Sequence, residues 1–386
     1  MQRILVATET YEELNDYFVE NKIKRVFLVC GASIELLRIN TYIQNLAERQ
    51  GIKVIRFSEF QPNPMYESIV QGVKVFREQH CDSIMAVGGG SAMDVAKCIK
   101  LYSNMDSSQN YLQQKIIPND IKMLAVPTTA GTGSEATKYA VIYYNGTKQS
   151  VTNDSCIPAA VLFDGSTLQT LPDYQRKSTM MDAFSHAMES FWSINSTEES
   201  REYSKKAIRM ILSNWDAYLA NEEKGNREML WAANIAGKAI NITQTTAGHS
   251  MCYKLTSLYG IAHGHAVAIC NTVLFPYLVQ NIEKCIDARG KEYLLKVLLQ
   301  LADTMGCKTP EEAADKFSEM VCGLGFEIPK PQIGDYAELK KSVNLERLKN
   351  YPIRLGENVI DELYHKILKQ DECRNAEFGK ANSKIY

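Results

Sequence analysis

Apolar and polar residues alternate in two different ways along the chain, and the change occurs near residue 170. Before it, short apolar runs alternate with segments in which apolar residues recur every three to four positions, as in strands alternating with helices. Segment 66–80 is one such helical segment, with Ile69, Val73 and Phe76 on one face. The predicted strands cover 25–30, 52–57, 82–87 and 122–126. This order predicts a mostly parallel sheet with helices on both faces.

Beyond residue 170, long segments of helical period replace the short apolar runs, and β-branched runs become rare. The predicted helices cover 174–193, 198–220, 226–245, 276–303, 310–324 and 356–369. We therefore expect two domains, an α/β domain over residues 1–170 and an all-α domain over residues 171–386. The length of 386 residues agrees with this division, because a single domain typically takes about 150 residues.

Composition and charge exclude several classes of protein. The net charge is −2, whereas a nucleic-acid binder usually carries an excess of basic residues, so we expect no nucleic-acid partner. No apolar run approaches the roughly 20 residues of a membrane span, and acidic residues stand where a signal peptide would need basic ones. The 10 cysteines include no C-x-x-C pair, which excludes zinc-ribbon and thioredoxin-type motifs, and their scatter along a long chain indicates reduced thiols. We expect a cytoplasmic protein without a membrane contact.

A glycine-rich loop follows the predicted strand at 82–87. The segment Gly88–Ser91 leads from this strand directly into a helical segment. Glycines let the backbone approach an anion, which the N–H groups and dipole of a helix start then stabilise. The loop matches neither G-x-G-x-x-G nor the P-loop, and a tight turn without a ligand is the alternative. A second loop of small residues at 127–134 follows the next strand, and together the two loops predict a nucleotide at the carboxyl edge of the sheet.

Three of the six histidines form a second candidate site with one aspartate. Asp182 and His186 are four residues apart in a predicted helix, which places both on one face. His249 and His263 follow in apolar surroundings, each beside a glycine. One carboxylate and three imidazoles could hold a divalent metal such as Fe²⁺ or Zn²⁺. From spacing alone, an ordinary polar contact between Asp182 and His186 remains the alternative.

Four motifs, in this order, resemble those of the iron-containing (group III) alcohol dehydrogenase family. They are GGGSAMDVAK at 88–97, PTTAGTGSEAT at 127–137, LP…MMDAFSHAMES at 171–190, and two histidines separated by 13 residues, the second followed by glycine, at 249–264. The resemblance spans the chain and implies a dehydroquinate synthase-like architecture. In it, an α/β dinucleotide-binding domain precedes a helical domain, and the metal lies in the cleft between them. A homodimer is the expectation at the level of the family.

By motif position, the resemblance implies that Asp182, His186, His249 and His263 bind the metal. It also implies a nicotinamide cofactor with its pyrophosphate on the glycine-rich loop. The expected cofactor-binding residues are Gly31, Asn63, Gly88, Gly89, Gly90, Ser91, Asp94, Lys97, Thr128, Thr129 and Thr132. An enzyme of this kind reduces an aldehyde to a primary alcohol, with the metal polarising the carbonyl and the nicotinamide delivering hydride.

Two positions depart from the family's pattern. Where many members carry a second histidine assigned to proton relay, this chain has Tyr253, which could relay protons or only line the pocket. At the end of the first cofactor strand, an acidic residue would bind the adenosine ribose and repel a 2′-phosphate. This chain has Gly31 there, followed by Ala32 and Ser33, which favours NADPH over NADH unless the glycine only forms a turn.

The strongest departure lies just before Asp182, where the family usually has small residues. Arg176 and Lys177 stand there instead, and two cations near a metal site suggest an anionic substrate. A solvated helix start is the alternative. Segments 171–200 and 246–269 resemble the phosphonoacetaldehyde reductase branch, which implies the reduction of phosphonoacetaldehyde to 2-hydroxyethylphosphonate in phosphonate biosynthesis. The candidate substrate contacts are Arg176, Lys177, Lys254 and His265, although His265 could be a structural histidine.

Three alternatives to this function remain open. The first is the reduction of a neutral short aldehyde such as lactaldehyde or butanal. The second is a sugar-phosphate lyase of the dehydroquinate synthase type, which uses NAD without net redox and would be excluded by persistent NADPH consumption with an aldehyde. The third is a nucleotide-binding sensor without catalysis, against which the complete set of one aspartate and three histidines argues.

Overall fold

The computed structural model describes residues 2–369 and divides the chain into two compact units. The first unit contains the chain up to Arg176 together with Ser213–Asn241. The second contains Lys177–Leu212 and the described chain from Ile242 onward. The predicted border at residue 170 assigned 213–241 to the helical domain, whereas its contacts group it with the α/β unit. Helical periodicity reveals that such a segment is a helix, but not which core it packs against.

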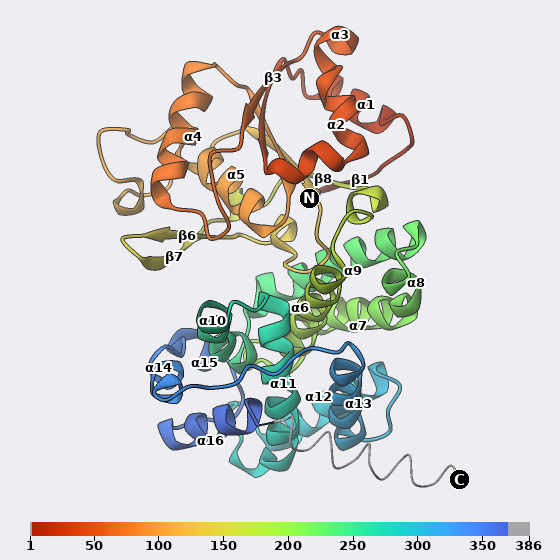
Figure 1. Ribbon diagram of the computed structural model, residues 1–386, viewed down its shortest axis with the longest axis vertical. Helices are drawn as coiled ribbons and strands as arrows, with labels where there is room; N and C mark the ends of the chain where they lie inside the picture. Colours follow the sequence, from red (N-terminus) through yellow and green to blue (C-terminus); the bar gives the residue numbers. More distant parts are fainter. Residues whose placement is uncertain (1, 370–386) are drawn as a thin grey trace. The chain divides into compact units, whose positions relative to one another are not determined.

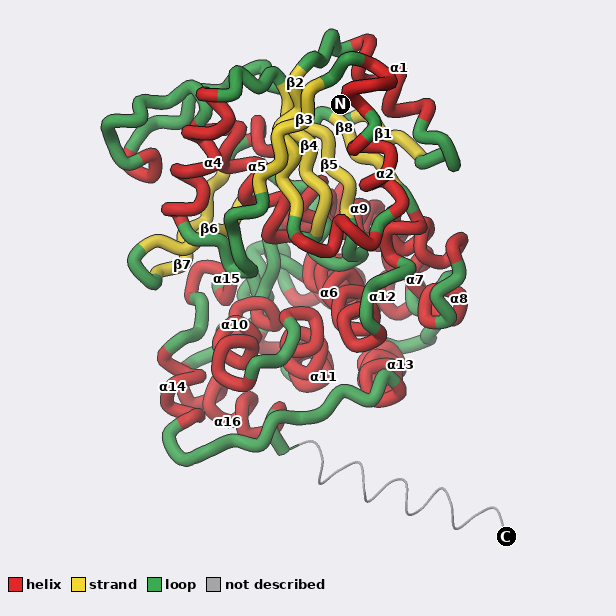
Figure 2. Tube along the Cα trace, turned by 45° about the horizontal axis from the view of Figure 1, so that its top comes forward, coloured by secondary structure: helices red, strands yellow, loops and turns green. Residues whose placement is uncertain are grey.

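A six-stranded parallel sheet forms the core of the first unit (Figure 2). The strand order is β1-β8-β5-β4-β2-β3. The strands are β1 (Arg3–Val6), β2 (Arg25–Cys30), β3 (Lys53–Phe57), β4 (Ser83–Gly88), β5 (Lys122–Pro127) and β8 (Ala160–Phe163). An antiparallel hairpin of β6 (Tyr139–Tyr144) and β7 (Thr147–Thr152) stands apart from this sheet. The four predicted strands are confirmed; β1, β8 and the hairpin were not predicted.

The chain leaves β2 and β4 in opposite directions across the sheet. These strands are direct neighbours, with Cys30 paired to Val87, but β2 continues to β3 on one side and β4 to β5 on the other. Open parallel sheets bind their ligands at the carboxyl ends of strands where the order reverses in this way. Gly31 follows the carboxyl end of β2, and the glycine-rich loop begins at the carboxyl end of β4. The topology therefore brings these two sequence features to the same crevice.

Helices cover the sheet of the first unit (Figure 1). The helices grouped with this unit are α1 (Glu12–Glu20), α2 (Arg38–Gln44), α3 (Leu46–Gln50), α4 (Tyr66–Glu78), α5 (Gly90–Tyr102), α8 (Trp215–Leu219) and most of α9 (Glu223–Thr243). In α4, Ile69, Val73 and Phe76 are buried as the helical period predicts, because they face the core. Helix α5 is almost wholly buried from Ala92 to Tyr102, which makes it the central helix of this unit.

The second unit is helical, and the described part of it contains no strand. Its helices are α6 (Asp173–Trp192, here from Lys177), α7 (Glu198–Ser213), α10 (Ala247–Tyr259), α11 (His263–Gln280), α12 (Lys291–Thr304), α13 (Pro310–Gly323), α14 (Asp335–Lys341), α15 (Leu345–Leu348) and α16 (Glu357–Ile367). The single helix predicted over 276–303 is wrong. Helix α11 ends at Gln280, and Gly290, with a φ of +89°, adopts a conformation that side-chain-bearing residues disfavour just before α12.

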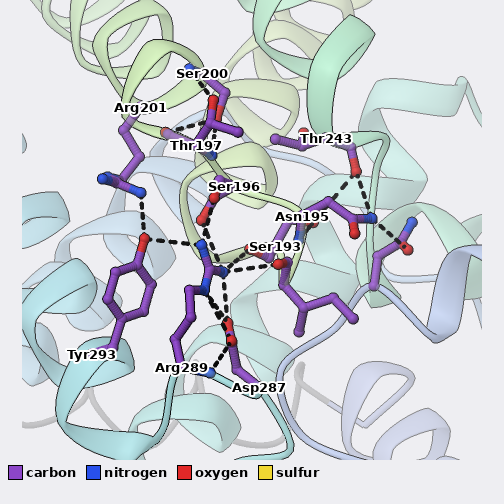
Figure 3. Close-up of polar contacts among 12 residues, drawn as sticks. Ser193, Asn195, Ser196, Thr197, Ser200, Arg201, Thr243, Asp287, Arg289 and Tyr293 are labelled. Atoms are coloured by element: carbon purple, nitrogen blue, oxygen red, sulfur yellow. Dashed lines mark hydrogen bonds and ion pairs between the residues drawn. The ribbon is translucent and has the colours of Figure 1, made fainter.

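Arg289 ties the end of helix α6 to the rest of the second unit (Figure 3). Its guanidinium is ion-paired with Asp287 at 2.6 Å and donates hydrogen bonds to the backbone carbonyls of Ser193 and Ser196. It also lies over the ring of Tyr293, with 4.2 Å between Cζ and the ring centroid. A cation is favourable at the carbonyl end of a helix, where backbone acceptors lack helical partners. Arg289 therefore fixes the helix that carries Asp182 and His186.

No described helix combines the length and the apolar character that crossing a membrane requires.

Candidate functional site

The four predicted metal ligands lie together in the second unit. The Nε2 atoms of His249, His186 and His263 lie 3.4, 3.8 and 3.9 Å from the same oxygen, Oδ1 of Asp182. Donor atoms of Asp182, His249 and His263 all lie within 4.8 Å of one another. The sequence could not establish this convergence, because 63 positions separate His186 from His249 along the chain.

Three helices contribute to this cluster. Asp182 and His186 lie one turn apart on α6, His249 lies in the first turn of α10, and His263 is the first residue of α11. Asp182, His186 and His249 are buried, whereas the His263 side chain is 37% exposed. The cluster is therefore open to solvent on the side of His263, as a site that admits a small substrate needs to be.

The spacing of these atoms fits a divalent metal. With metal–donor bonds of about 2.1 Å, neighbouring donors of a tetrahedral set are separated by about 3.4 Å. The observed separations of 3.4 to 3.9 Å from Asp182 Oδ1 are close to this value. A carboxylate with imidazoles suits Fe²⁺ and Zn²⁺ alike. The three residues Asp182, His249 and His263 therefore form a divalent metal site.

Glu189 supports this site and was not predicted. Its Oε1 lies 2.7 Å from Nδ1 of His249, and its Oε2 accepts hydrogen bonds from the backbone N–H and the hydroxyl of Thr246. Asn271 donates a further hydrogen bond to Oε1. When His249 donates its Nδ1–H to Glu189, its Nε2 lone pair is directed toward the cluster, as a metal ligand requires. The spacing 182, 186 and 189 on one helix face could have revealed Glu189.

The opposite charges inside the cluster determine the pKa values of its side chains. Burial raises the pKa of Asp182, but the nearby imidazoles of His186, His249 and His263 outweigh it and hold that pKa below its usual range. Burial also raises the pKa of Glu189, but the charge of His249 and the hydrogen bonds to the Glu189 carboxylate outweigh it and lower that pKa to about 2. Burial lowers the pKa of His249, yet Glu189 and Asp182 raise it to about 9. The cluster is built to hold positive charge, either as a proton on His249 or as a cation.

Two glycines allow the three helices to approach closely enough. A Cβ atom on Gly264 would lie 1.8 Å from the carbonyl oxygen of Ser178 and 2.9 Å from Cβ of Asp182. A Cβ atom on Gly248 would lie 2.4 Å from Oε1 of Glu189. Only glycine fits at these contacts, because such distances are far below normal van der Waals separations. The close contacts between the helices therefore require glycine at the positions beside His249 and His263.

Tyr253 lies against the metal site. Its ring is stacked on that of His263, with 5.7 Å between the centroids and 14° between the planes. Burial raises the pKa of the Tyr253 phenol, and the nearby Arg347 guanidinium opposes this shift in part through its charge and a hydrogen bond. Tyr253 thus packs against a metal ligand, and its proton-relay role stays a prediction.

Arg176, which was expected to contact an anionic substrate, binds oxygens of the protein instead. Only 2% of its surface is exposed, and its guanidinium donates to the backbone oxygens of Leu168 and Tyr218. It also donates to the side-chain oxygens of Asn221 and Asn226, at 2.6 Å each. At least four of its five N–H groups thus bind protein oxygens within the first unit. Arg176 is a structural residue, which the charge pattern could not reveal.

The other expected substrate contacts differ in their surroundings. The Lys254 ammonium is ion-paired with Glu338 of α14. His265 is buried, with its ring stacked on Phe326 at 4.4 Å, and burial lowers its pKa to about 4. This favours the structural alternative for His265, whose imidazole stays neutral near pH 7. Lys177 is half-buried on α6, five residues before Asp182.

The glycine-rich loop and the second loop contact each other in the first unit. Helix α5 begins at Gly90, and within residues 2–369 no side chain caps its start at Gly89. The backbone N–H of Thr128 donates to the carbonyl of Gly88 at 3.1 Å. Cβ atoms built on Gly89 and Gly90 would lie 3.2 and 3.1 Å from the side chains of Thr129 and Thr132, respectively. Uncapped N–H groups beside hydroxyl groups fit a pyrophosphate.

Asp94 and Lys97, expected to bind the cofactor, instead brace this region. The Lys97 side chain is fully buried, and its ammonium donates to the backbone oxygens of Ser134, Thr137 and Tyr139 at 2.6, 2.9 and 2.7 Å. Burial lowers the pKa of Lys97, and the Asp94 charge opposes this in part. Asp94 accepts hydrogen bonds from the Ser134 hydroxyl and a backbone N–H. Lys97 is fully buried and therefore acts through the loop, whereas Asp94 is half-buried, and its contact with the cofactor stays a prediction.

The remaining cofactor candidates lie at the edge of the sheet. Gly31 has φ −86° and ψ −179°, and a Cβ atom built there would meet nothing within 4 Å. Ser91 is half-buried in the first turn of α5. Asn63 is exposed in the loop after β3, with a φ of +60°. The open space at Gly31 could accept a ligand group, whereas nothing about Asn63 beyond its position supports a contact.

Comparisons with known proteins agree with this geometry. A model of the iron-containing alcohol dehydrogenases matches residues 2–165, and a model of the C-terminal region of the Fe-containing alcohol dehydrogenase family matches residues 177–342. Alcohol dehydrogenase 4 of Saccharomyces cerevisiae is 28% identical over 290 residues, which are 72% of this chain and 74% of that protein. The 1,3-propanediol dehydrogenase of Citrobacter freundii is 30% identical over 278 residues, 68% of this chain and 70% of its own.

A solved structure has the same fold. Sulfoacetaldehyde reductase from Bifidobacterium kashiwanohense, in complex with NAD⁺, superposes with a TM-score of 0.84 at 23% sequence identity. The match covers 95% of this chain and 97% of that one.

Proposed function

Because this chain belongs to the iron-containing alcohol dehydrogenase family, we propose that it reduces phosphonoacetaldehyde to 2-hydroxyethylphosphonate with NADPH. At the coarser level, it is a metal-dependent, NAD(P)-linked oxidoreductase that interconverts an aldehyde and an alcohol. The observation that carries the function is the convergence of Asp182, His249 and His263 on one point in the second unit.

The residues of the site divide the work of the reaction. A divalent metal held there supplies a Lewis acid for the carbonyl oxygen, and the reduced nicotinamide supplies the hydride. Asp182 contributes the charge of the ligand set, and His186 is proposed as its fourth member because its Nε2 lies 3.8 Å from Asp182 Oδ1. Glu189 keeps His249 in the tautomer that directs Nε2 inward. Tyr253, stacked on His263, is proposed to donate the proton that the product hydroxyl needs.

The cofactor is proposed to bind at the carboxyl edge of the parallel sheet. Its pyrophosphate is expected at Gly88–Ser91, with Thr128, Thr129 and Thr132 alongside. The uncapped start of α5 supports this placement, because its N–H groups attract phosphate. The open space around Gly31 supports NADPH, since no acidic side chain follows β2 directly to repel a 2′-phosphate.

The substrate is proposed from the resemblance of segments 171–200 and 246–269 to phosphonoacetaldehyde reductases. Lys177 is a candidate contact because it is half-buried on α6, five residues before Asp182. Arg176 and Lys254 contact other residues of the protein. A homodimer and a cytoplasmic location stay predictions from the family resemblance and the composition.

A panel of initial rates tests this function. The metal-loaded enzyme is assayed with NADPH and with NADH, each against phosphonoacetaldehyde and against propanal, a neutral aldehyde of similar length. We expect the highest kcat/KM for NADPH with phosphonoacetaldehyde. A preference for propanal would refute the proposed substrate, and a preference for NADH would refute the proposed cofactor.

A neutral short-chain alcohol or aldehyde is the second candidate substrate. The observation in its favour is that Arg176 and Lys254, two of the three Arg and Lys residues among the expected substrate contacts, already bind protein oxygens. The same panel decides between the two, because a neutral substrate would give propanal the higher kcat/KM.

A further inference from the structure

A short helix brings a cation to the metal site from a part of the sequence that no motif covers. Helix α15 packs against α10, the helix that carries His249 and Tyr253 (Figure 1). Two hydrogen bonds fix the start of α15: the Ser250 hydroxyl donates to the carbonyl of Asn344 at 2.7 Å, and the Asn344 N–H donates to the carbonyl of Ser250 at 3.3 Å. The Asn344 side chain then caps the helix by accepting from the backbone N–H of Arg347. The position of Arg347 is therefore set by α10.

The Arg347 side chain lies beside Tyr253. Its guanidinium is hydrogen-bonded to the Tyr253 side chain, whose ring is stacked on the metal ligand His263. The Tyr253 side chain thus lies between the Arg347 guanidinium and the metal ligand His263. Arg347 is half-buried, and His263 is the most exposed member of the metal cluster. The guanidinium is therefore linked through Tyr253 to the ligand that solvent reaches most easily.

Other charged groups of these helices form pairs of their own. Lys254 of α10 is ion-paired with Glu338 of α14, and Lys349 is ion-paired with Glu346 at 2.7 Å. Both members of the second pair are largely exposed. These pairs neutralise neighbouring charges on α10 and α15, and the guanidinium of Arg347 places a positive charge beside Tyr253.

We propose that Arg347 binds the anionic group of the substrate and selects an aldehyde that carries a phosphonate, or a similar tetrahedral anion, close to its carbonyl carbon. The proposal rests on the proposed function. In a two-carbon aldehyde whose carbonyl oxygen is at the metal, the anionic group must lie within about one side-chain length of the ligands. A guanidinium presents a planar fork of donors that matches the oxygens of such a group.

The test compares R347M and R347K with the matched control R209M. Arg209 lies on α7 in the same unit and is ion-paired with Asp303 at 3.8 Å. Metal-loaded enzymes are assayed with NADPH against phosphonoacetaldehyde and propanal. We expect R347M to lower kcat/KM for phosphonoacetaldehyde by about 10- to 100-fold, the usual effect of losing hydrogen bonds to a charged group, and to change that for propanal by less than about threefold. R347K should retain part of the preference, and R209M should match the wild type.

A binding measurement gives a readout that needs no turnover. Ethylphosphonate, which has the anion but no aldehyde, is titrated calorimetrically into the metal-loaded wild type and R347M. We expect the dissociation constant to rise at least tenfold in R347M and to rise with ionic strength in the wild type, because a partly exposed charge pair is screened by salt.

The outcomes separate this inference from the proposed function. A wild-type enzyme that prefers propanal overturns both. A wild type that prefers phosphonoacetaldehyde, together with equal losses on both aldehydes in R347M, overturns only the role of Arg347 and assigns it to orienting Tyr253. If R347M does not fold, as judged by circular dichroism and metal content, R347K decides: unchanged selectivity together with unchanged ethylphosphonate binding also overturns the inference.

Discussion

Replacing Gly264 with alanine should remove the metal from an otherwise folded protein. The added Cβ would lie 1.8 Å from the carbonyl oxygen of Ser178, whereas real Cβ atoms essentially never come closer than 3.0 Å. The start of α11 must therefore move away from α6 by at least about 1.2 Å, the difference between these two distances. Metal–ligand bonds tolerate deviations of only about 0.2 Å, so His263 cannot keep its bond while Asp182 keeps its own.

The expected magnitude follows from this displacement. A misplacement of about 1 Å at a reacting centre commonly lowers activity by about 100-fold, and we expect a loss of at least that size in metal affinity. Overpacking of this kind also lowers the free energy of unfolding by about 1 to 3 kcal/mol. The fold should survive, because the clash is local to the contact between α6 and α11.

The assay measures metal content by mass spectrometry and metal affinity by competition with a chelator. Gly323→Ala is the matched control, because a Cβ at Gly323, in the same unit, would meet nothing within 4 Å. Metal binding by Gly264→Ala within about threefold of the wild type, with a native fold by circular dichroism, would refute the predicted displacement of His263.

Four further predictions concern other parts of the account. Glu189→Gln should weaken metal binding by about 10- to 100-fold, measured by chelator competition, because it removes the carboxylate that orients His249. Metal affinity should rise with pH up to about 9, because metal-free His249 is protonated below that pH. Metal binding at pH 7 should therefore release a proton, which calorimetry in two buffers of different ionisation enthalpy would detect. Gly31→Asp should shift the ratio of kcat/KM from NADPH toward NADH by about tenfold or more, through repulsion of the 2′-phosphate. Lys97→Met should lower the free energy of unfolding by about 3 kcal/mol, measured by urea titration, because two buried carbonyls and one half-buried carbonyl lose their donor. An unchanged midpoint would contradict that role.

Much of the fold and of the metal site could be predicted from the sequence, because the relevant signals are local. Apolar runs identified β2 through β5, and the spacing of Asp182 and His186 on one helix identified half of the ligand set. The motifs added His249 and His263, which local spacing could not connect. The two glycines next to these histidines allow the helices to meet, a consequence visible only once α6, α10 and α11 are placed together.

The charged residues were the least predictable part of the site. In the sequence, Arg176 and Lys97 carry the positive charge expected of residues that bind an anionic substrate or a phosphate, yet both are buried donors to backbone carbonyls. Arg347 has no motif around it and reaches Tyr253 only through the packing of α15 on α10. The sequence shows where a cationic side chain stands, but the group that it binds depends on tertiary contacts.

The central claim is that Asp182, His249 and His263, together with His186, hold the metal on which the reaction depends. Its most direct test is a titration of the metal-free enzyme with Zn²⁺ or, without oxygen, Fe²⁺, while the initial rate of aldehyde-dependent NADPH oxidation is followed. The account predicts a rate that rises from the background to a plateau at one metal ion per chain, and no such rise in Asp182→Asn. A metal-free enzyme at full rate, or an Asp182→Asn variant that titrates like the wild type, would contradict it.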